Sequence, residues 1–195
     1  MIRVIDYKAG NAASVLNAVR YLGFAADFAR CADDIESATH IILPGTGSAA
    51  ATMESLGEMG IIPVLDEVVL GNQVFFLGIC VGMQILFEHS EEGNTTCLGW
   101  LKGRVVKFDS QKVRVPKMGW SKVVLNSSAE EYFYFVNSYY ALPGDSADLY
   151  GVANYNGEFA AAVRRGNIFG TQFHAEKSGE AGLSLLRNFF ERGML

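Results

Sequence analysis

The sequence contains little of what marks a secreted, membrane-bound or nucleic-acid-binding protein. Lysine and arginine total 16 against 21 acidic residues, which leaves a net charge of −5, and the basic residues form no cluster. This balance argues against a nucleic-acid partner. No apolar run approaches the roughly 18 residues of a membrane span, and the N-terminal stretch lacks the pattern of a signal peptide. We therefore expect a cytoplasmic protein without a membrane partner.

Cysteine and histidine are also scarce, with three of each in 195 residues. The three cysteines cannot all pair, and their spacing matches no zinc site. We therefore expect a reduced protein with neither a metal nor another cofactor. The small number also means that each cysteine and each histidine can be weighed individually as a candidate nucleophile or base.

The first half of the chain alternates strand-like apolar runs with helical patterns. Strands are expected at 2–6, 24–29, 39–45 and 73–79, and helices at 11–22, at 49–70 in two pieces, and at 82–89. Asn11 is a suitable cap for the first helix. Strands that are apolar on both faces and alternate with helices indicate a parallel sheet covered by helices on both sides.

The texture changes after residue 92, where strand-like runs are separated by turn residues. Asn156-Gly157 is a strong hairpin signal, and a last helix is expected from about Glu180 to Arg192. No repeat or linker divides the chain, and 195 residues can bury roughly 70% of their unfolded surface. The sequence therefore predicts one α/β domain over 1–195, a parallel sheet with antiparallel strands added in the second half.

Cys80 lies in a pattern that suits a nucleophile. A strand, then Gly78-x-Cys80-x-Gly82, then a helix is the cysteine form of a nucleophile elbow, whose tight turn excludes bulky neighbours. The turn would present the thiol at the carboxyl edge of the sheet and at a helix N-terminus, which favours thiolate. The amide of Val81 would then face a developing oxyanion. The alternative is a buried structural cysteine with incidental glycines.

Neither of the other two cysteines, Cys31 and Cys97, has such a setting, and we expect both to be unreactive. A second glycine loop, "LPGTGS" at 43–48, follows a predicted strand and should emerge at the same sheet edge as Cys80. An amide of Thr46 or Gly47 is the candidate for the second oxyanion donor. The loop could also be a plain turn, and its spacing is not that of a phosphate-binding loop.

A thiol nucleophile needs a base, usually a histidine oriented by a third group. His40 begins a predicted strand and suits packing, and His89 would lie roughly 13 Å along the helix from Cys80. His174 remains, at the end of an apolar strand, with Glu176 on the same face of an extended segment. Cys80, His174 and Glu176 form the expected triad; the alternative is a strand-end histidine beside a solvated glutamate.

Taken together, these stretches resemble the triad-type (class I) glutamine amidotransferases, a flavodoxin-like fold, and the resemblance spans nearly the whole chain. Within that family they are most similar to the glutaminase subunits of imidazole glycerol phosphate synthases, from histidine biosynthesis. The resemblance is carried, in order, by "DYKAGN", "LPGTGS", "GICVGMQILFE", "GRVVKF", "VPKMGWSKV", "YFYFVNSYY" and "TQFHAEKSGEAGLSLLRNF".

The resemblance implies a chemistry and a partner. Cys80 would attack the side-chain amide of L-glutamine to give a thioester, and His174 would activate the water that hydrolyses it. The released ammonia would pass to a cyclase subunit, a (β/α)8 barrel, in a heterodimer. Matching positions suggest that Gln84 and the backbone of Ser138 and Tyr139 hold glutamine. Asn11 and Lys177 would face the partner.

Four positions depart from the pattern of that family. It usually has histidine at Lys117 and Asn137, glycine at Lys8 and proline at Ala175. A histidine-biosynthesis subunit could drift in this way, and so could a paralogue that supplies ammonia to a different synthase, for example one that amidates a sugar of a surface polysaccharide. A cysteine peptidase is a weaker alternative, which would need a substrate groove and no synthase partner. A non-enzymatic regulatory subunit is also weaker, because it would be expected to have lost a triad member.

Overall fold

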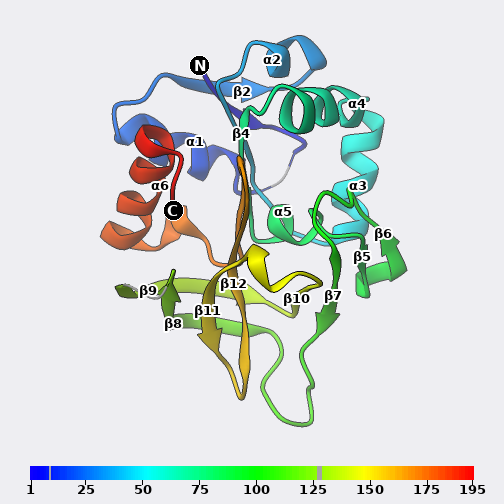
Figure 1. Cartoon of the computed structure of the whole chain (residues 1–195), viewed down its shortest axis with the longest axis vertical. Coiled ribbons are helices and arrows are strands. Elements are labelled where there is room, and N and C mark those ends of the chain that lie inside the picture. The colour runs from blue at the N-terminus through cyan, green and yellow to red at the C-terminus, as the bar shows by residue number, and fades with distance from the viewer. Residues whose placement is uncertain (9, 127–128) are drawn as a thin grey trace.

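A mixed sheet of nine strands runs through the molecule and carries helices around its parallel half (Figure 1). The computed structural model describes residues 1–8, 10–126 and 129–195. Ala9, within the "DYKAGN" stretch, lies outside the described residues. The strand order is β2-β1-β3-β4-β13-β12-β11-β8-β9, and a smaller sheet has the order β10-β7-β5-β6.

The larger sheet is parallel on one side and antiparallel on the other, as the sequence predicts. Its parallel strands are β2 (Ala26–Ala29), β1 (Ile2–Ile5), β3 (His40–Leu43), β4 (Phe75–Ile79) and β13 (Ile168–Thr171). The antiparallel strands are β12 (Glu158–Arg165), β11 (Leu149–Asn154), β8 (Lys117–Leu125) and β9 (Ala129–Asn137). The smaller sheet comprises β10 (Tyr139–Pro143), β7 (Gly103–Lys107), β5 (His89–Ser90) and β6 (Thr95–Thr96).

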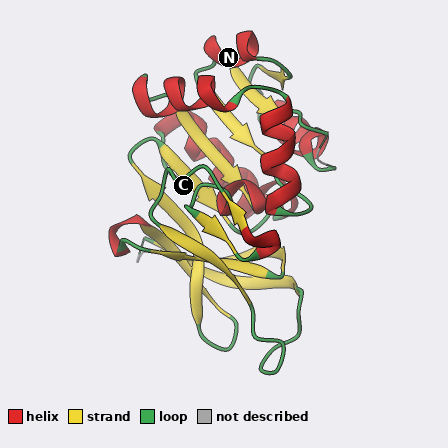
Figure 2. Cartoon of the chain, turned by 90° about the vertical axis from the view of Figure 1, so that its right-hand side faces the viewer, coloured by secondary structure: helices red, strands yellow, loops and turns green. Residues whose placement is uncertain are grey.

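Helices lie on both sides of the parallel strands, with α1 and α6 on the left of Figure 1 and α3 and α4 on the right. Figure 2 shows that most helices gather around this upper part, whereas the lower part is made of strands and loops. None of the helices in the described ranges is long and apolar enough to cross a membrane. The helices are α1 (Ala12–Tyr21), α2 (Ala32–Glu36), α3 (Ala49–Glu58), α4 (Ile62–Leu65), which continues as a π-helix (Asp66–Gly71), α5 (Val81–Gln84) and α6 (Gly179–Arg192).

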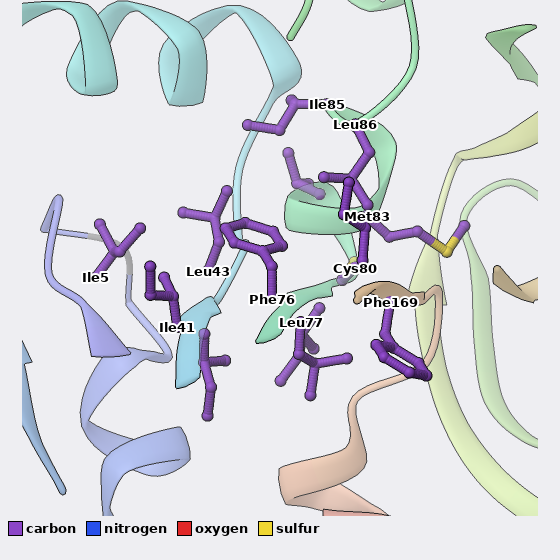
Figure 3. Packing of buried hydrophobic residues seen from close by; sticks show 14 of the residues in the cluster. Ile5, Ile41, Leu43, Phe76, Leu77, Cys80, Met83, Ile85, Leu86 and Phe169 are labelled. Carbon is purple, nitrogen blue, oxygen red and sulfur yellow. The ribbon is translucent and has the colours of Figure 1, made fainter. Parts of the chain in front are cut away.

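The core lies where the central strands meet the helices. Ile41, Phe76, Leu77 and Phe169 are fully buried on β3, β4 and β13, and Figure 3 shows them packed around the chain that leads to Cys80. Each such side chain contributes about 1.5–3 kcal/mol relative to an exposed position. The strand that carries the candidate nucleophile is therefore held from both of its faces.

The register of three neighbouring strands positions the site. Leu43 of β3 lies beside Gly78 of β4, and Thr171 of β13 lies beside Ile79 of β4. The three strands run parallel, so they end at the same sheet edge. The loops that follow them begin at Pro44, Cys80 and Gln172 and meet there.

The helix predicted at 82–89 is wrong beyond its first turn. Helix α5 ends at Gln84, and His89 begins β5, where it pairs with Arg104 of β7. The carbonyls of Ile85, Leu86 and Phe87 accept hydrogen bonds from the N–H groups of Leu98, Leu101 and Gly99. Tertiary hydrogen bonds thus replace those that would have continued the helix. His89 therefore does not lie on the helix that follows Cys80, and its predicted distance of roughly 13 Å along that helix does not apply.

Candidate active site

Cys80 occupies a strained turn between β4 and α5. Its backbone has φ 56° and ψ −109°, a conformation that L-residues rarely adopt, and its N–H donates to the Thr171 carbonyl at 2.7 Å. Strain of this kind persists only where the surroundings impose it, and it is typical of a nucleophile elbow. The side chain is 4% exposed and lines a pocket. Helix α5, at four residues, is much shorter than the helix expected to begin there.

The glycines around Cys80 are required by close backbone packing. A Cβ on Gly78 would overlap the Gly82 carbonyl, and a Cβ on Gly82 would overlap the carbonyl oxygen of Leu43. Gly45, in the neighbouring loop, would meet the backbone nitrogen of Gly82 in the same way. Three segments therefore cross at contact distance, which is what the glycine spacing predicts.

Replacing Gly82 by alanine is expected to lower the free energy of unfolding by about 2 kcal/mol or more, because backbone has to move to admit the methyl group. The matched control is Gly57→Ala, in α3, where a Cβ would meet nothing within 4 Å. That change should be neutral or stabilise by up to about 1 kcal/mol. Urea denaturation of both variants tests this, and equal stabilities would contradict the packing argument.

His174 and Glu176 lie behind the sulfur of Cys80. His174 is 3% exposed, and its Nδ1 is 2.9 Å from Oε1 of Glu176, which also accepts a hydrogen bond from Asn11 Nδ2 at 3.1 Å. The sequence predicts an extended segment here, and this prediction is wrong, because Ala175–Lys177 form a 3₁₀ turn. The Lys177 N–H donates to the His174 carbonyl, so the turn itself brings the two side chains together.

Asn11 begins α1, as predicted, but its side chain does not cap that helix. The side chain turns to Glu176 instead, and Asn11 is 2% exposed in the chain by itself. Lys177, by contrast, is exposed on the rim of the pocket. Of the two residues expected to face a partner, one therefore supports the carboxylate from behind and the other reaches solvent.

The charges of the cluster favour a protonated histidine. Burial by itself would lower the pKa of His174, but its hydrogen bonds to the Cys80 sulfur and to Glu176, together with their negative charges, raise it to about 9. Burial acts to raise the pKa of Glu176, and the bonds from His174 and Asn11 reverse this and lower it. His174 is therefore placed to hold a proton at neutral pH.

This arrangement predicts a particular pH dependence. The folded-state pKa of His174 lies above its ordinary value of 6.5, so protonated His174 stabilises the folded state. This contribution to the free energy of unfolding is complete below pH 6.5 and is lost as the pH rises through about 9. NMR of the imidazole nitrogens should give a midpoint near 9 in the wild type. Cys80→Ala should lower that midpoint, because a hydrogen-bond partner and a charge are removed.

His40 serves as the internal control in that titration. Burial among Phe75, Phe189 and Phe190 lowers the pKa of His40, and it does not contact Cys80, so its midpoint should be the same in both proteins. A His174 midpoint near 6.5 in both proteins would contradict the prediction. This packed setting also agrees with the expectation that His40 is a structural residue.

The pocket in front of Cys80 has a volume of about 330 Å³. It brings together most of the residues that the sequence singled out, from loops that are far apart in the chain. Its lining includes Gly45, Thr46, Gly47, Cys80, Val81, Gln84, Glu92, Pro116, Val136, Asn137, Ser138, Tyr139, His174 and Lys177.

The candidate oxyanion donors Val81, Thr46 and Gly47 all line this pocket, and a buried tyrosine lies against the loop that carries two of them. Burial raises the pKa of Tyr7, and bonds from the Thr52 side chain and the Thr46 N–H partly offset this effect. The Tyr7 hydroxyl itself donates to the Pro44 carbonyl at 2.8 Å. Tyr7 therefore holds the start of the loop that carries Thr46 and Gly47.

The expected glutamine-binding residues form a network of their own. The Gln84 Nε2 donates to the Tyr139 carbonyl and to the Gln172 Oε1, each at 3.0 Å. Asn137 Nδ2 donates to the same Tyr139 carbonyl at 2.9 Å, and the Ser138 carbonyl accepts from the Phe108 N–H. Gln84 therefore has its Oε1 left as the atom through which it can bind a ligand.

Two polar residues of the site escaped sequence reasoning. Glu92 lines the pocket, and its Oε2 accepts from the Ala49 N–H at 2.8 Å at the start of α3. It stands outside any recognisable motif, so nothing local indicated it. Gln172 is fully buried beside Cys80, and a glutamine within an apolar strand two residues before His174 was a signal that could have found it.

The departures at Lys117 and Asn137 lie opposite each other on β8 and β9. Lys117 is 3% exposed; its Nζ donates to Ser121 Oγ at 2.6 Å and lies over the rings of Phe135 and Tyr155. Burial lowers its pKa. Ala175 is buried in the 3₁₀ turn, and Lys8 has φ 66°, a value that favours the glycine usual there.

The other two cysteines lie outside the pocket. Cys97 is buried, and this burial raises the pKa of its thiol to about 11, which disfavours the reactive thiolate. Cys31 is exposed and its thiol donates to Asp34 at 3.4 Å. Neither cysteine has a histidine among its hydrogen-bond partners in the described part of the chain.

Comparison with known proteins agrees with this geometry. Residues 3–192 match the family model described as glutamine amidotransferase class-I, and the chain belongs to that family. It is therefore a glutamine amidotransferase, an enzyme that takes nitrogen from glutamine.

The curated relatives narrow the similarity further. The chain is 41% identical to the imidazole glycerol phosphate synthase subunit HisH of Leptospira interrogans, over 97% of this chain and 98% of that protein. It is 43% identical to subunit HisH 2 of Pseudomonas aeruginosa, over 98% and 99%. In Arabidopsis thaliana, the chloroplastic synthase hisHF is 40% identical over 97% of this chain, which covers 34% of that longer protein.

Solved structures show the same fold at lower identity. A glutamine amidotransferase crystal structure superposes with a TM-score of 0.81 at 19% identity, covering 97% of both chains. A chain of PurLQS from Thermotoga maritima gives 0.75 at 18% identity, covering 97% of this chain and 96% of that one.

Proposed function

We propose that this chain is the glutaminase subunit of an imidazole glycerol phosphate synthase and supplies ammonia to a cyclase subunit. The observation that carries the proposal is the meeting of Cys80, in a strained elbow, with the His174–Glu176 pair at one pocket. Full-length relatives at about 40% identity support the choice of synthase. The larger sheet uses strands from both halves of the chain, which supports a single domain over 1–195. We place this domain in the reducing cytoplasm, where free cysteines persist.

The first half-reaction forms a thioester. The Cys80 sulfur attacks the side-chain amide carbon of glutamine, and the negative charge that develops on oxygen is stabilised by the Val81 N–H and an amide of the Thr46-Gly47 loop. The carbon–nitrogen bond then breaks. His174, protonated at neutral pH, gives its proton to the leaving nitrogen, so that ammonia departs and a glutamyl thioester remains.

The second half-reaction restores the enzyme. Having lost its proton, His174 takes one from water, which attacks the thioester carbon through a second oxyanion. Collapse of that intermediate releases the Cys80 thiolate and the carboxylic acid of the product, which becomes glutamate by losing its proton to solvent, while the first proton stays on His174. Glu176 holds the ring through Nδ1 and stabilises its charge in both steps.

The pocket has groups suited to the rest of the glutamine molecule. Glu92 is a carboxylate of the lining and suits the α-ammonium group. Gln84 Oε1 can accept a hydrogen bond, whereas the Tyr139 and Ser138 carbonyls are already engaged. We therefore assign substrate contacts at Ser138 and Tyr139 to their N–H groups.

The rim of the pocket supports docking of a synthase partner of the (β/α)8-barrel type in a heterodimer. Met118, Trp120 and Tyr132 are exposed on β8 and β9, an apolar face that continues to the pocket because Met118 pairs with Val136 of its lining. Lys177 is exposed on the same rim. Asn11 is buried, so it would respond to the partner through Glu176.

The test is the glutaminase activity of the purified chain mixed with a cyclase subunit from the same source, with and without its nucleotide substrate. We expect low activity of the chain by itself and stimulation of at least ~10²-fold in the loaded complex, the size of one oxyanion donor. Full activity of the free chain would contradict the expectation that the cyclase subunit stimulates the glutaminase. If the cyclase gives no stimulation but a reactive glutamine analogue still labels Cys80, the chain is a glutaminase that serves a different synthase.

The second candidate is a paralogue that supplies ammonia to a different synthase, for example one that amidates a sugar. Lys117 and Asn137 favour it, because they replace the usual histidines next to the pocket. The same mixing experiment with the cyclase separates the two candidates, since the paralogue would not respond to it.

A further inference from the structure

Gln172 lies against the nucleophile, buried between the end of β13 and His174. Its side chain is fully buried, its backbone N–H donates to the Ala161 carbonyl at 2.8 Å, and its Nε2 donates to the Cys80 sulfur at 3.6 Å. Its Oε1 accepts from Gln84 Nε2 at 3.0 Å. Both ends of the amide are therefore in use, one toward the sulfur and one toward the glutamine pocket.

The direction of this chain of hydrogen bonds is dictated by the Tyr139 carbonyl. A carbonyl can only accept, so Gln84 must turn its Nε2 toward Tyr139. The second hydrogen of that nitrogen then goes to Gln172, which must present its oxygen there and its own N–H to Cys80. An amide that could otherwise be placed either way round is thus oriented by a backbone group of the substrate pocket.

The two protonation states of Cys80 have different partners. As a thiol, the sulfur donates to the Val136 carbonyl at 3.8 Å, whereas a thiolate has no proton for that bond. A thiolate accepts, and the Gln172 N–H and His174 are the donors beside it. The Gln172 bond therefore favours the nucleophilic form over the form that turns toward Val136.

We propose that Gln172 is a positioning residue that holds Cys80 as a thiolate and links it, through Gln84, to the Tyr139 backbone of the glutamine pocket. It acts through the sulfur and does not touch the substrate. A bond to a charged group of this kind corresponds to a change of about 10- to 100-fold in rate. The inference deepens the proposed glutaminase function and rests on it for its meaning in turnover.

The test is the pH profile of Cys80 alkylation by iodoacetamide, in which the thiolate displaces iodide from carbon, followed by peptide mass spectrometry to separate Cys80 from Cys31 and Cys97. Gln172→Glu keeps the shape and the acceptor but removes the donor and adds a negative charge. We expect its profile to move to higher pH by about one unit or more and kcat to fall by about 10- to 100-fold, with a smaller change in KM.

Two further variants keep the test decisive. Gln172→Met removes the donor without adding charge and should move the profile in the same direction by less. Gln111→Glu adds the same charge at an exposed position and should leave both the profile and glutaminase activity unchanged. Unfolding in urea shows whether each variant is folded.

The results separate this inference from the proposed function. If folded Gln172→Met and Gln172→Glu both keep the wild-type alkylation profile, Gln172 is only a core residue and the inference is overturned. Alkylation needs no glutamine, so a shifted profile in a protein that hydrolyses no glutamine would support the contact and reject the function. Gln172 variants with a wild-type alkylation profile and normal glutaminase activity would support the proposed function and reject the role of Gln172.

Discussion

Cys80→Ala is expected to abolish glutamine-dependent synthesis by the complex with its synthase, while synthesis from added ammonium salt continues at the wild-type rate. The thioester cannot form without the sulfur, and no other cysteine of the chain lines the pocket in the described structure. Ammonia supplied from solution makes the glutaminase step unnecessary. Product formation is measured with each nitrogen source on the same preparation. The ratio of the glutamine-dependent rate to the ammonium-dependent rate should fall by about 10⁴-fold or more relative to the wild type.

Cys31→Ala is the matched control, because it removes an exposed thiol distant from the pocket lining. Both nitrogen sources should support synthesis at wild-type rates in that variant. An equal loss of both activities in Cys80→Ala would mean that Cys80 maintains the complex or the fold, and the separation of roles between the two subunits would be wrong.

Glu176→Gln is expected to lower glutaminase kcat by roughly 10²- to 10⁴-fold. The Glu176 Oε1 accepts from His174 and Asn11, and an amide oxygen can do the same. The Oε2, buried without a hydrogen-bond partner, is where the amide nitrogen would lie. The geometry is therefore retained while the charge that raises the pKa of His174 is lost.

Glu180→Gln provides the control for this change, since it removes the same charge at an exposed position in the first turn of α6. Its kcat should match the wild type. The Glu176→Gln titration of His174, followed by NMR, should have its midpoint below 9. If kcat and that midpoint were both unchanged, Glu176 would have no electrostatic role.

Elements with strong local signals were predictable from the sequence. The hairpin at Asn156-Gly157 joins β11 and β12 with both residues at positive φ, and α6 begins and ends within a residue of its predicted bounds. These elements depend on turn chemistry and on helical spacing within a few residues. The helix at 82–89 was mispredicted because the partners of its carbonyls, at 98–101, lie in another segment.

The candidate site divides in the same way. The elbow could be deduced because the need for small residues at Gly78 and Gly82 is local. Elimination among the three histidines selects His174, and one step of it depends on the part of the helix predicted at 82–89 that lies beyond α5 and is absent from the described structure. His174 nevertheless lines the pocket, whereas His89 lies in the smaller sheet.

By itself, the sequence determined the alternation of strands and helices, the steric requirements of the elbow and the residue types available for chemistry. All of these follow from interactions between near neighbours in the chain. Only the tertiary structure decided that β13 lies beside β4, which brings His174 to Cys80 across more than ninety positions. It also decided that Glu92 lines the pocket in front of Cys80 and that Gln172 contacts the Cys80 sulfur. Contacts between such distant segments depend on the packing of the whole core.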